Sequence, residues 1–261
     1  MAITYSKSPV IREGWLRAII FCAAYILATY LVGLLAGSAL AISFVQKGDA
    51  SLNTGTLVIL AMVVVSITGI ALSIVFRRFI DGKPIVSLGL DRHLHRNDAW
   101  AGLLLSVVLL GIGAIILYFA GTLRWVDARF NGSEFFLVLM LILLLAVSEE
   151  FVFRGYLLNN LMESFNKWTA LLASAMLFTI AHSFNPHLGP VALINLFLGG
   201  LLLGMNFIYT KTLWFAIGFH FGWNLLQGCV LGYAVSGLTS QTMLQQELKG
   251  HPIMTGDSIG F

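Results

Sequence analysis

The feature that most constrains this chain is a series of long apolar runs with almost no charged residues. The first run, residues 18–46, is uncharged throughout. About 20 mostly apolar residues suffice for a helix to cross the hydrocarbon core of a bilayer. Six further runs follow, at residues 57–76, 100–123, 134–147, 168–181, 188–209 and 213–235. The sequence therefore predicts an all-α fold, a polytopic transmembrane bundle of about seven spans.

Composition excludes the main alternatives to a membrane protein. The chain is 58% hydrophobic and 10% charged, whereas soluble domains are about one quarter charged. The net charge is +3, but the basic residues are scattered through short connections rather than gathered in a patch, so nucleic acid is not an expected partner. The first apolar run is also longer than the roughly 7–15-residue core of a signal peptide. We expect it to remain as the first helix, with the lipid bilayer as its surroundings.

The distribution of basic residues predicts the orientation of the bundle. With a cytoplasmic N-terminus, the segments on the inner side carry most of the basic residues, as the positive-inside rule requires. These inner residues are Lys7, Arg12, Arg17, Arg77, Arg78, Lys83, Arg92, Arg96, Lys167 and Lys211. The predicted location is the cell membrane, with multiple passes and the N-terminus in the cytoplasm.

Two adjacent carboxylates, Glu149 and Glu150, follow directly on the uncharged residues 135–148. A carboxylate at mid-membrane costs about 2.5–3.5 kcal/mol on insertion scales, and we expect the fourth span to end at this cluster of charges. On a helix Glu150 and Arg154 stand four residues apart and can pair. Glu149 is rotated by about 100° from Glu150, which leaves its carboxylate available as a general base.

Three further polar side chains interrupt later apolar runs. His182 follows Phe178 by four residues at the end of the fifth run, and His220 and Asn224 share one helix face in the seventh. Because lipid cannot satisfy polar groups, such side chains are expected to gather inside the protein. The sequence therefore predicts one pocket that contains Glu149, His182, His220 and Asn224. Two other polar residues, Asn195 and Asn206 in the sixth run, are expected to bond across helices.

A pocket of this kind can hydrolyse an amide. A desolvated carboxylate is a competent base near neutrality, and an imidazole can polarise water and protonate the leaving amine. A second histidine with an asparagine can donate hydrogen bonds to the developing oxyanion. The set Glu149, His182 and His220 could instead hold zinc with an open water position, although no His-Glu-x-x-His helix signature is present.

Two other functions are consistent with the same residues. Intramembrane glutamate and histidine also mark proton relays, so a proton- or ion-coupled transporter is an alternative hypothesis. A non-catalytic membrane immunity or scaffold protein is another.

At these residues the chain resembles the CPBP family of intramembrane proteases, which includes the CAAX prenyl protease 2 and bacteriocin-processing types. The family pattern is Glu-Glu-x-x-x-Arg, Phe-x-x-x-His and His-x-x-x-Asn on successive helices, and all three stand here in order. The resemblance covers about residues 84–261, and it begins near Ser87-Leu88-Gly89-Leu90. Residues 1–83 would hold the first two helices and their connection.

The resemblance implies a metallo- or glutamate-type endopeptidase that acts on membrane-associated peptides or proteins, with a cavity open to the cytoplasmic side. It implies that Glu149 and His182 activate water and that His220 and Asn224 form the oxyanion site. Glu150 and Arg154 would have supporting roles. Zinc is the cofactor that this chemistry would use if a metal takes part.

Overall fold

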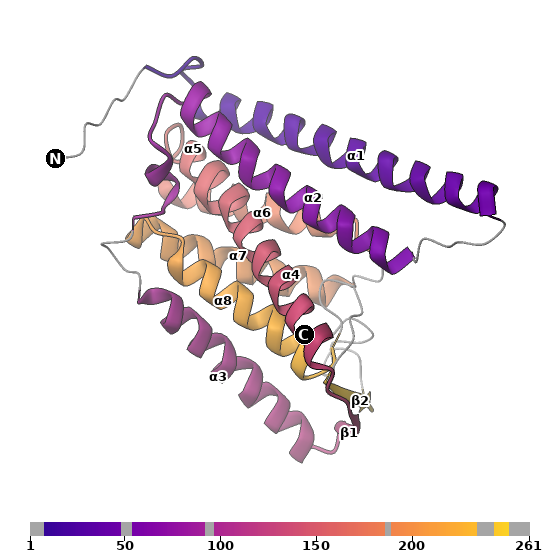
Figure 1. Cartoon of the computed structure of the whole chain (residues 1–261). Helices are drawn as coiled ribbons and strands as arrows, with labels where there is room; N and C mark the ends of the chain where they lie inside the picture. Colours follow the sequence, from indigo (N-terminus) through magenta and orange to yellow (C-terminus); the bar gives the residue numbers. More distant parts are fainter. Residues whose placement is uncertain (1–7, 48–53, 92–96, 186–188, 234–242, 251–261) are drawn as a thin grey trace.

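The predicted all-α membrane fold is confirmed. A computed structural model describes residues 8–47, 54–91, 97–185, 189–233 and 243–250 (Figure 1). Its α-helices are α1 Gly14–Lys47, α2 Thr54–Val75, α3 Asp98–Phe119, α4 Gly132–Glu150, α5 Asn159–Leu161, α6 Lys167–His182, α7 Pro190–Thr210 and α8 Trp214–Asn224. Shorter helical segments are η1 Phe76–Ile80, η2 Ile85–Leu88, η3 Phe151–Leu158 and η4 Leu225–Val230.

Five segments of the described chain are long and apolar enough to cross a membrane, and these make the protein a multi-pass membrane protein. They are Gly14–Ala39, Gly55–Ile80, Asp98–Phe119, Gly132–Leu161 and Pro190–Thr210. The fifth and seventh predicted spans are shorter helices, because α6 has 16 residues and α8 has 11. These two short helices carry both histidines and the asparagine of the predicted pocket.

The expectation that the fourth span ends at the charge cluster is wrong. The helix continues from α4 through η3 and α5, and Gly132–Leu161 forms a single segment of 30 residues. Glu150 and Arg154 are buried inside the protein and pair with each other, so their charges do not require the interface. Glu149 consequently lies in the interior of a long span instead of at its end.

Helices α6 and α7 form an antiparallel pair in close contact. A Cβ atom added to Gly200 would lie 3.1 Å from the Cα and Cβ atoms of Ala175, and one added to Gly204 would lie 2.5 Å from Cδ1 of Leu171. The two glycines therefore let the helix backbones approach, as small residues do in membrane helix pairs.

Helices α3 and α8 lie side by side and also approach through glycines (Figure 1). A Cβ atom at Gly102 would lie 2.2 Å from the backbone oxygen of Phe215. One at Gly218 would lie 2.0 Å from the backbone oxygen of Ala99. No side chain fits at either contact, so this pairing fixes the position of α8 and of the residues it carries.

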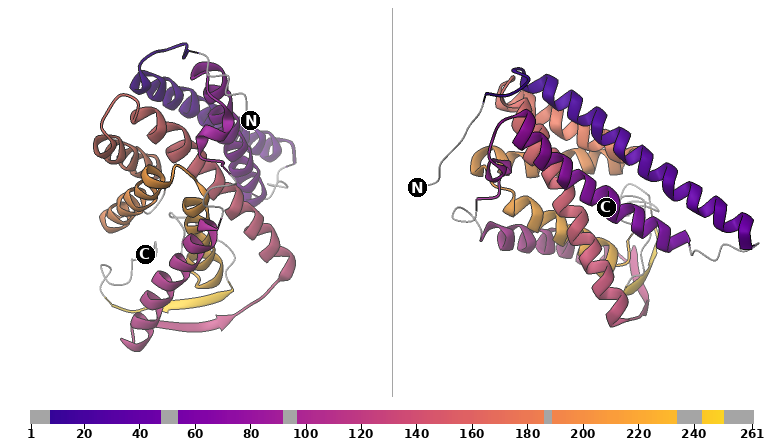
Figure 2. Two further views of the ribbon diagram at one scale, coloured as in Figure 1. Left: turned by 90° about the vertical axis from the view of Figure 1, so that its left-hand side faces the viewer. Right: turned by 45° about the horizontal axis from the view of Figure 1, so that its top comes forward.

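A small antiparallel sheet was not predicted. Strand β1, Leu123–Ala128, pairs with β2, Leu244–Leu248, and both are drawn at one end of α3 (Figure 2). The sequence placed Leu123 in the third predicted span, and residues 244–248 lie after the last predicted span. In the structure Leu123 packs with Ala114, Leu117 and Tyr233 in a separate apolar cluster.

A buried network of charges joins the first helix to the rest of the protein. Arg17 and Arg77 both pair with Asp81, at 3.1 and 2.9 Å, and all three side chains are almost fully buried. Glu163 accepts from Arg17 and Lys83 at the edge of this network. From the sequence, Arg17 and Arg77 were expected to be basic residues of cytoplasmic segments. Because both side chains are buried, their ion pairs with Asp81 have a structural role.

Candidate active site

The carboxylate of Glu149 lies between two imidazole rings. Its Oε2 atom is 3.4 Å from Nε2 of His182 and 3.7 Å from Nε2 of His220. The three residues come from α4, α6 and α8, which are far apart in the sequence. The structure therefore brings together three of the four side chains predicted to share a pocket, and the fourth, Asn224, lies one turn beyond His220.

Helix lengths explain how Glu149 and His182 reach the same depth. Glu149 stands twelve residues before Leu161, and His182 stands fifteen residues after Lys167. Leu161 and Lys167 flank one short turn, so these separations correspond to about 18 and 22 Å along the two helices. The contact depends on the long continuation of α4 through η3, which the sequence analysis did not predict.

Glu150 occupies a fully buried position and has two partners. Its Oε1 atom accepts from the Arg154 guanidinium at 2.7 Å and from Nδ1 of His220 at 2.8 Å. The Arg154 guanidinium also lies 4.6 Å above the ring of Phe178. The pairing of Glu150 with Arg154 is as the sequence predicts. The bond to His220 is an addition that sequence spacing could not reveal, because it joins α4 to α8.

Hydrogen bonding fixes the tautomer of each histidine. Nδ1 of His182 lies 2.8 Å from the backbone oxygen of Phe178, and a carbonyl oxygen only accepts, so Nδ1 carries the proton. Nδ1 of His220 likewise donates to the carboxylate of Glu150. When neutral, both rings therefore present the lone pair of Nε2 toward Glu149.

Three acceptors thus meet at one point. Oε2 of Glu149 is buried and has no hydrogen-bond partner within the described chain, and the two Nε2 lone pairs face it. Three acceptors this close together are stabilised when one of them carries a proton, or when a water molecule donates hydrogen bonds to two of them. The arrangement is suited to holding a water molecule and removing a proton from it.

The same atoms were predicted to bind zinc if a metal is used. Among the described residues, no group of three or more His, Cys, Asp or Glu side chains is arranged to hold a metal ion. The donor types nevertheless match a catalytic zinc site, with one carboxylate and two imidazoles. Each ring also has the outer hydrogen-bond acceptor that ligating histidines normally have. Zinc binding by Glu149, His182 and His220 stays a prediction.

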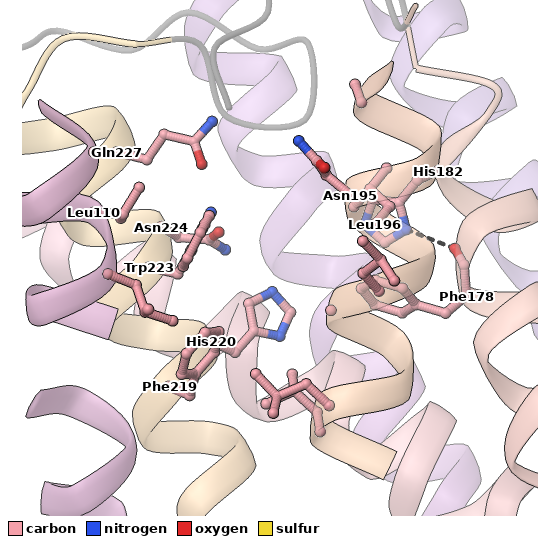
Figure 3. A pocket seen from close by; sticks show the side chains of 17 residues that line it. Leu110, Phe178, His182, Asn195, Leu196, Phe219, His220, Trp223, Asn224 and Gln227 are labelled. Carbon is pink, nitrogen blue, oxygen red and sulfur yellow. Dashed lines mark hydrogen bonds between the residues drawn. The ribbon is translucent and has the colours of Figure 1, made fainter. Parts of the chain in front are cut away.

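A pocket of about 410 Å³ adjoins the histidines (Figure 3). It is lined by residues of α3, α6, α7, α8 and η4, and most of the wall is apolar. His220 and Asn224 both line it, as their four-residue spacing predicts. Glu149 is not among the lining residues. Its carboxylate contacts Nε2 of both histidines, and 22% of its side chain is exposed. The carboxylate therefore contacts two rings that line the pocket without lining it itself.

Two residues of the pocket wall were not predicted as site residues. Gln227 of η4 follows Asn224 by three residues and so shares its face of the helix, and Asn195 lies on α7. The three-residue spacing from Asn224 could have predicted Gln227 as a pocket residue.

The expected role of Asn195 and Asn206 in bonding across helices is not what the structure shows. Oδ1 of Asn206 accepts from Thr210 of the same helix at 3.3 Å.

The fold and this site define a helical membrane protein with a glutamate and two histidines converging beside an internal pocket. Residues 131–226 match the family model described as type II CAAX prenyl endopeptidase Rce1-like. This agrees with the resemblance to CPBP proteases, and the matched segment contains Glu149, Glu150, Arg154, His182, His220 and Asn224. The matched family is described as one of prenyl endopeptidases, and the match covers less than half of the chain. Comparisons with curated proteins and with solved structures give no match.

Proposed function

We propose that this protein hydrolyses a peptide bond in membrane-associated peptides or proteins, with Glu149 as the general base. The observation that carries the proposal is the convergence of Glu149 Oε2 with two Nε2 atoms, at 3.4 and 3.7 Å. All three residues lie in the family-matched segment, and both histidines line a pocket. General bases of this kind must lie within hydrogen-bond reach of the water, directly or through a small adjustment.

In the proposed reaction a water molecule lies against Glu149 and His182. Glu149 takes a proton as the water oxygen forms a bond to the carbonyl carbon of the substrate. The carbon–nitrogen bond then breaks, and the proton passes to the departing amine through His182 or Glu149. The products are a carboxylic acid and an amine, and the enzyme returns to its starting protonation state.

Asn224 and His220 are the proposed donors to the oxyanion. The Asn224 carboxamide lines the pocket beside His220 and carries two N–H donors. Because Nδ1 of His220 already donates to Glu150, its Nε2 can donate only when the ring is an imidazolium. Glu150 thus acts by holding His220 in position, and Arg154 holds Glu150.

The zinc alternative uses the same three side chains as ligands. If zinc is bound there, it would supply Lewis-acid activation of the attacking water near neutral pH. Metal analysis of the purified protein decides between the two versions. Stoichiometric zinc that is lost in His182→Ala would assign these residues as ligands.

In the proposed orientation the helical bundle lies in the cell membrane and its N-terminus is in the cytoplasm. Exposed basic residues support it, because Arg12, Arg78, Lys167 and Lys211 lie in the segments predicted to be inside. Labelling of single cysteines introduced at Arg12 and at Arg129 in intact cells tests the orientation. Reaction of the first position from outside the cell would reverse it.

Proteoliposomes allow the enzyme and the transporter hypotheses to be separated. The assay uses two fluorogenic peptides, one prenylated at a C-terminal cysteine and one attached to a helical membrane anchor, together with a measurement of proton flux. We expect cleavage of at least one peptide and its loss in Glu149→Ala. Proton flux that depends on Glu149, without cleavage, would favour the transporter. Biological activity that persists in Glu149→Gln would favour a non-catalytic partner.

A further inference from the structure

We propose that Asn195 is a substrate-positioning residue, which hydrogen-bonds the peptide backbone of the substrate across the pocket from Asn224. This inference rests on the proposed protease function and adds to it a second point of contact with the peptide. No sequence motif identified above includes Asn195.

The position of Asn195 places it on the far wall of the pocket. It lies on α7, its side chain is exposed, and it lines the pocket together with His182 and Asn224. In Figure 3 its carboxamide points into the cavity from the α7 side, whereas Asn224 and Gln227 lie on the opposite side. A chain bound in the pocket would therefore pass between two carboxamides.

Asn195 lies at nearly the same level along the α6–α7 helix pair as His182. Gly200 faces Ala175 and Gly204 faces Leu171 in the antiparallel α6–α7 pair. This register places residue 193 opposite His182, so Asn195 is about 3 Å further along the helix axis. A peptide group held by Asn195 would thus lie about one residue from a group in reach of the proposed catalytic water.

The surroundings of Asn195 leave its carboxamide available. Among the described residues no hydrogen bond to its side chain is found, whereas Asn206 on the same helix accepts from Thr210. An exposed carboxamide that lines the pocket and has no partner in the described chain can bond a ligand without breaking an existing hydrogen bond. A bound peptide would satisfy it.

The chemistry of a carboxamide matches that of a peptide group. Its oxygen accepts and its nitrogen donates, which complements the N–H and C=O of an extended backbone. The neighbouring wall is apolar and includes Leu196, Leu198 and Leu202. A peptide that enters this pocket loses water, so each polar contact that replaces the lost water aids its binding.

The test compares Asn195→Leu with Asn206→Leu, in proteoliposomes, on the better-cleaved of the two peptides defined above. Leucine removes the hydrogen-bonding groups and keeps a similar size. We expect Asn195→Leu to raise KM about 5- to 10-fold, which corresponds to the loss of one hydrogen bond, with a smaller change in kcat. Asn195→Gln should recover part of the loss. Asn206→Leu should leave KM within about 2-fold of the unsubstituted protein, because its side chain bonds within α7.

A second measurement replaces single backbone amides of the peptide with esters, one position at a time. An ester lacks the N–H donor, so one position should weaken cleavage by the unsubstituted protein but not by Asn195→Leu. If every ester affects both proteins equally, or if KM of Asn195→Leu is unchanged, the positioning role is wrong while the protease function stands. If the unsubstituted protein cleaves neither peptide, the protease function itself is overturned. Melting of each variant in detergent shows whether a loss of activity reflects unfolding.

Discussion

Nδ1 of His220 lies 2.8 Å from Oε1 of Glu150, and the same oxygen accepts a hydrogen bond from Arg154. One fully buried carboxylate therefore fixes both an arginine of its own helix and a histidine of α8. This contact orients Nε2 of His220 toward Glu149. Two adjacent glutamates consequently have different tasks, because one is held in structural pairs and the other faces the histidine nitrogens.

Replacement of Glu150 tests this division. Glu150→Gln leaves the Arg154 guanidinium buried without its counter-charge, and breaking one partner of a buried pair costs about 3–5 kcal/mol. We expect a large fall in the melting temperature in detergent, together with loss of peptide cleavage. The control is Glu13→Gln at an exposed position before α1, which should change neither. Equal melting of the two variants would contradict the structural role of Glu150.

Asn224→Ala tests the oxyanion site. Removal of one oxyanion donor typically lowers kcat by about 10²–10³-fold. We expect a loss of this size with KM changed much less, and with the melting temperature near that of the unsubstituted protein. Steady-state kinetics on the cleaved peptide provides the measurement. A variant with unchanged kcat would remove Asn224 from the mechanism.

The contact between α3 and α8 makes a prediction about two glycines. Gly218→Ala places a Cβ atom 2.0 Å from the backbone oxygen of Ala99, so the helices must separate. Overpacking of this kind costs about 1–3 kcal/mol, and it should also displace the nearby His220 and reduce cleavage. Gly111→Ala on α3 meets no atom within 4 Å and gains helix propensity, so it should be neutral or slightly stabilising. Thermal unfolding and activity of the two variants are compared side by side.

The charge network around Glu163 predicts how stability depends on pH. Burial opposes ionisation of this carboxyl group, but hydrogen bonds from Lys83 and Arg17 outweigh it and lower the pKa of Glu163 below its ordinary value. A lowered folded-state pKa gives stability that is present above the ordinary carboxyl pKa and lost as pH falls through the lowered value. Glu163 is partly exposed, so we expect an effect of about 1 kcal/mol.

The measurement for Glu163 is the difference in melting temperature between the unsubstituted protein and Glu163→Gln. This difference should be largest near neutral pH and should shrink as pH falls below about 4. A difference that stays constant down to pH 3 would show that the carboxylate charge does not contribute.

The sequence predicted the membrane class and the grouping of Glu149 with His182 and His220, because both depend on residue type and on the position of polar residues in apolar runs. Uncharged runs identify helices in lipid, and the four-residue intervals place Glu150 with Arg154 and His220 with Asn224. The sequence misplaced the end of the fourth span, because a pair of charges that neutralise each other in the interior looks the same as a charged helix end. The continuation of that helix to Leu161 is a tertiary effect.

Contacts between distant segments were also beyond sequence reasoning. The bond from His220 to Glu150, the pairing of Arg17 with Asp81 and the β1–β2 sheet each join residues more than 60 positions apart. Spacing within one helix carries no information about such contacts. Asn195 shows the same limit, because a polar residue in an apolar run indicates only that some partner is needed.

The central claim is that Glu149 activates the water that splits the peptide bond, and Glu149→Gln tests it most directly. Glutamine keeps the size of the side chain and removes its basicity. We expect the variant to fold with an unchanged or higher melting temperature, and its kcat on the better-cleaved peptide to fall by at least about 10²-fold. Cleavage at the rate of the unsubstituted protein by a correctly folded Glu149→Gln would contradict the account.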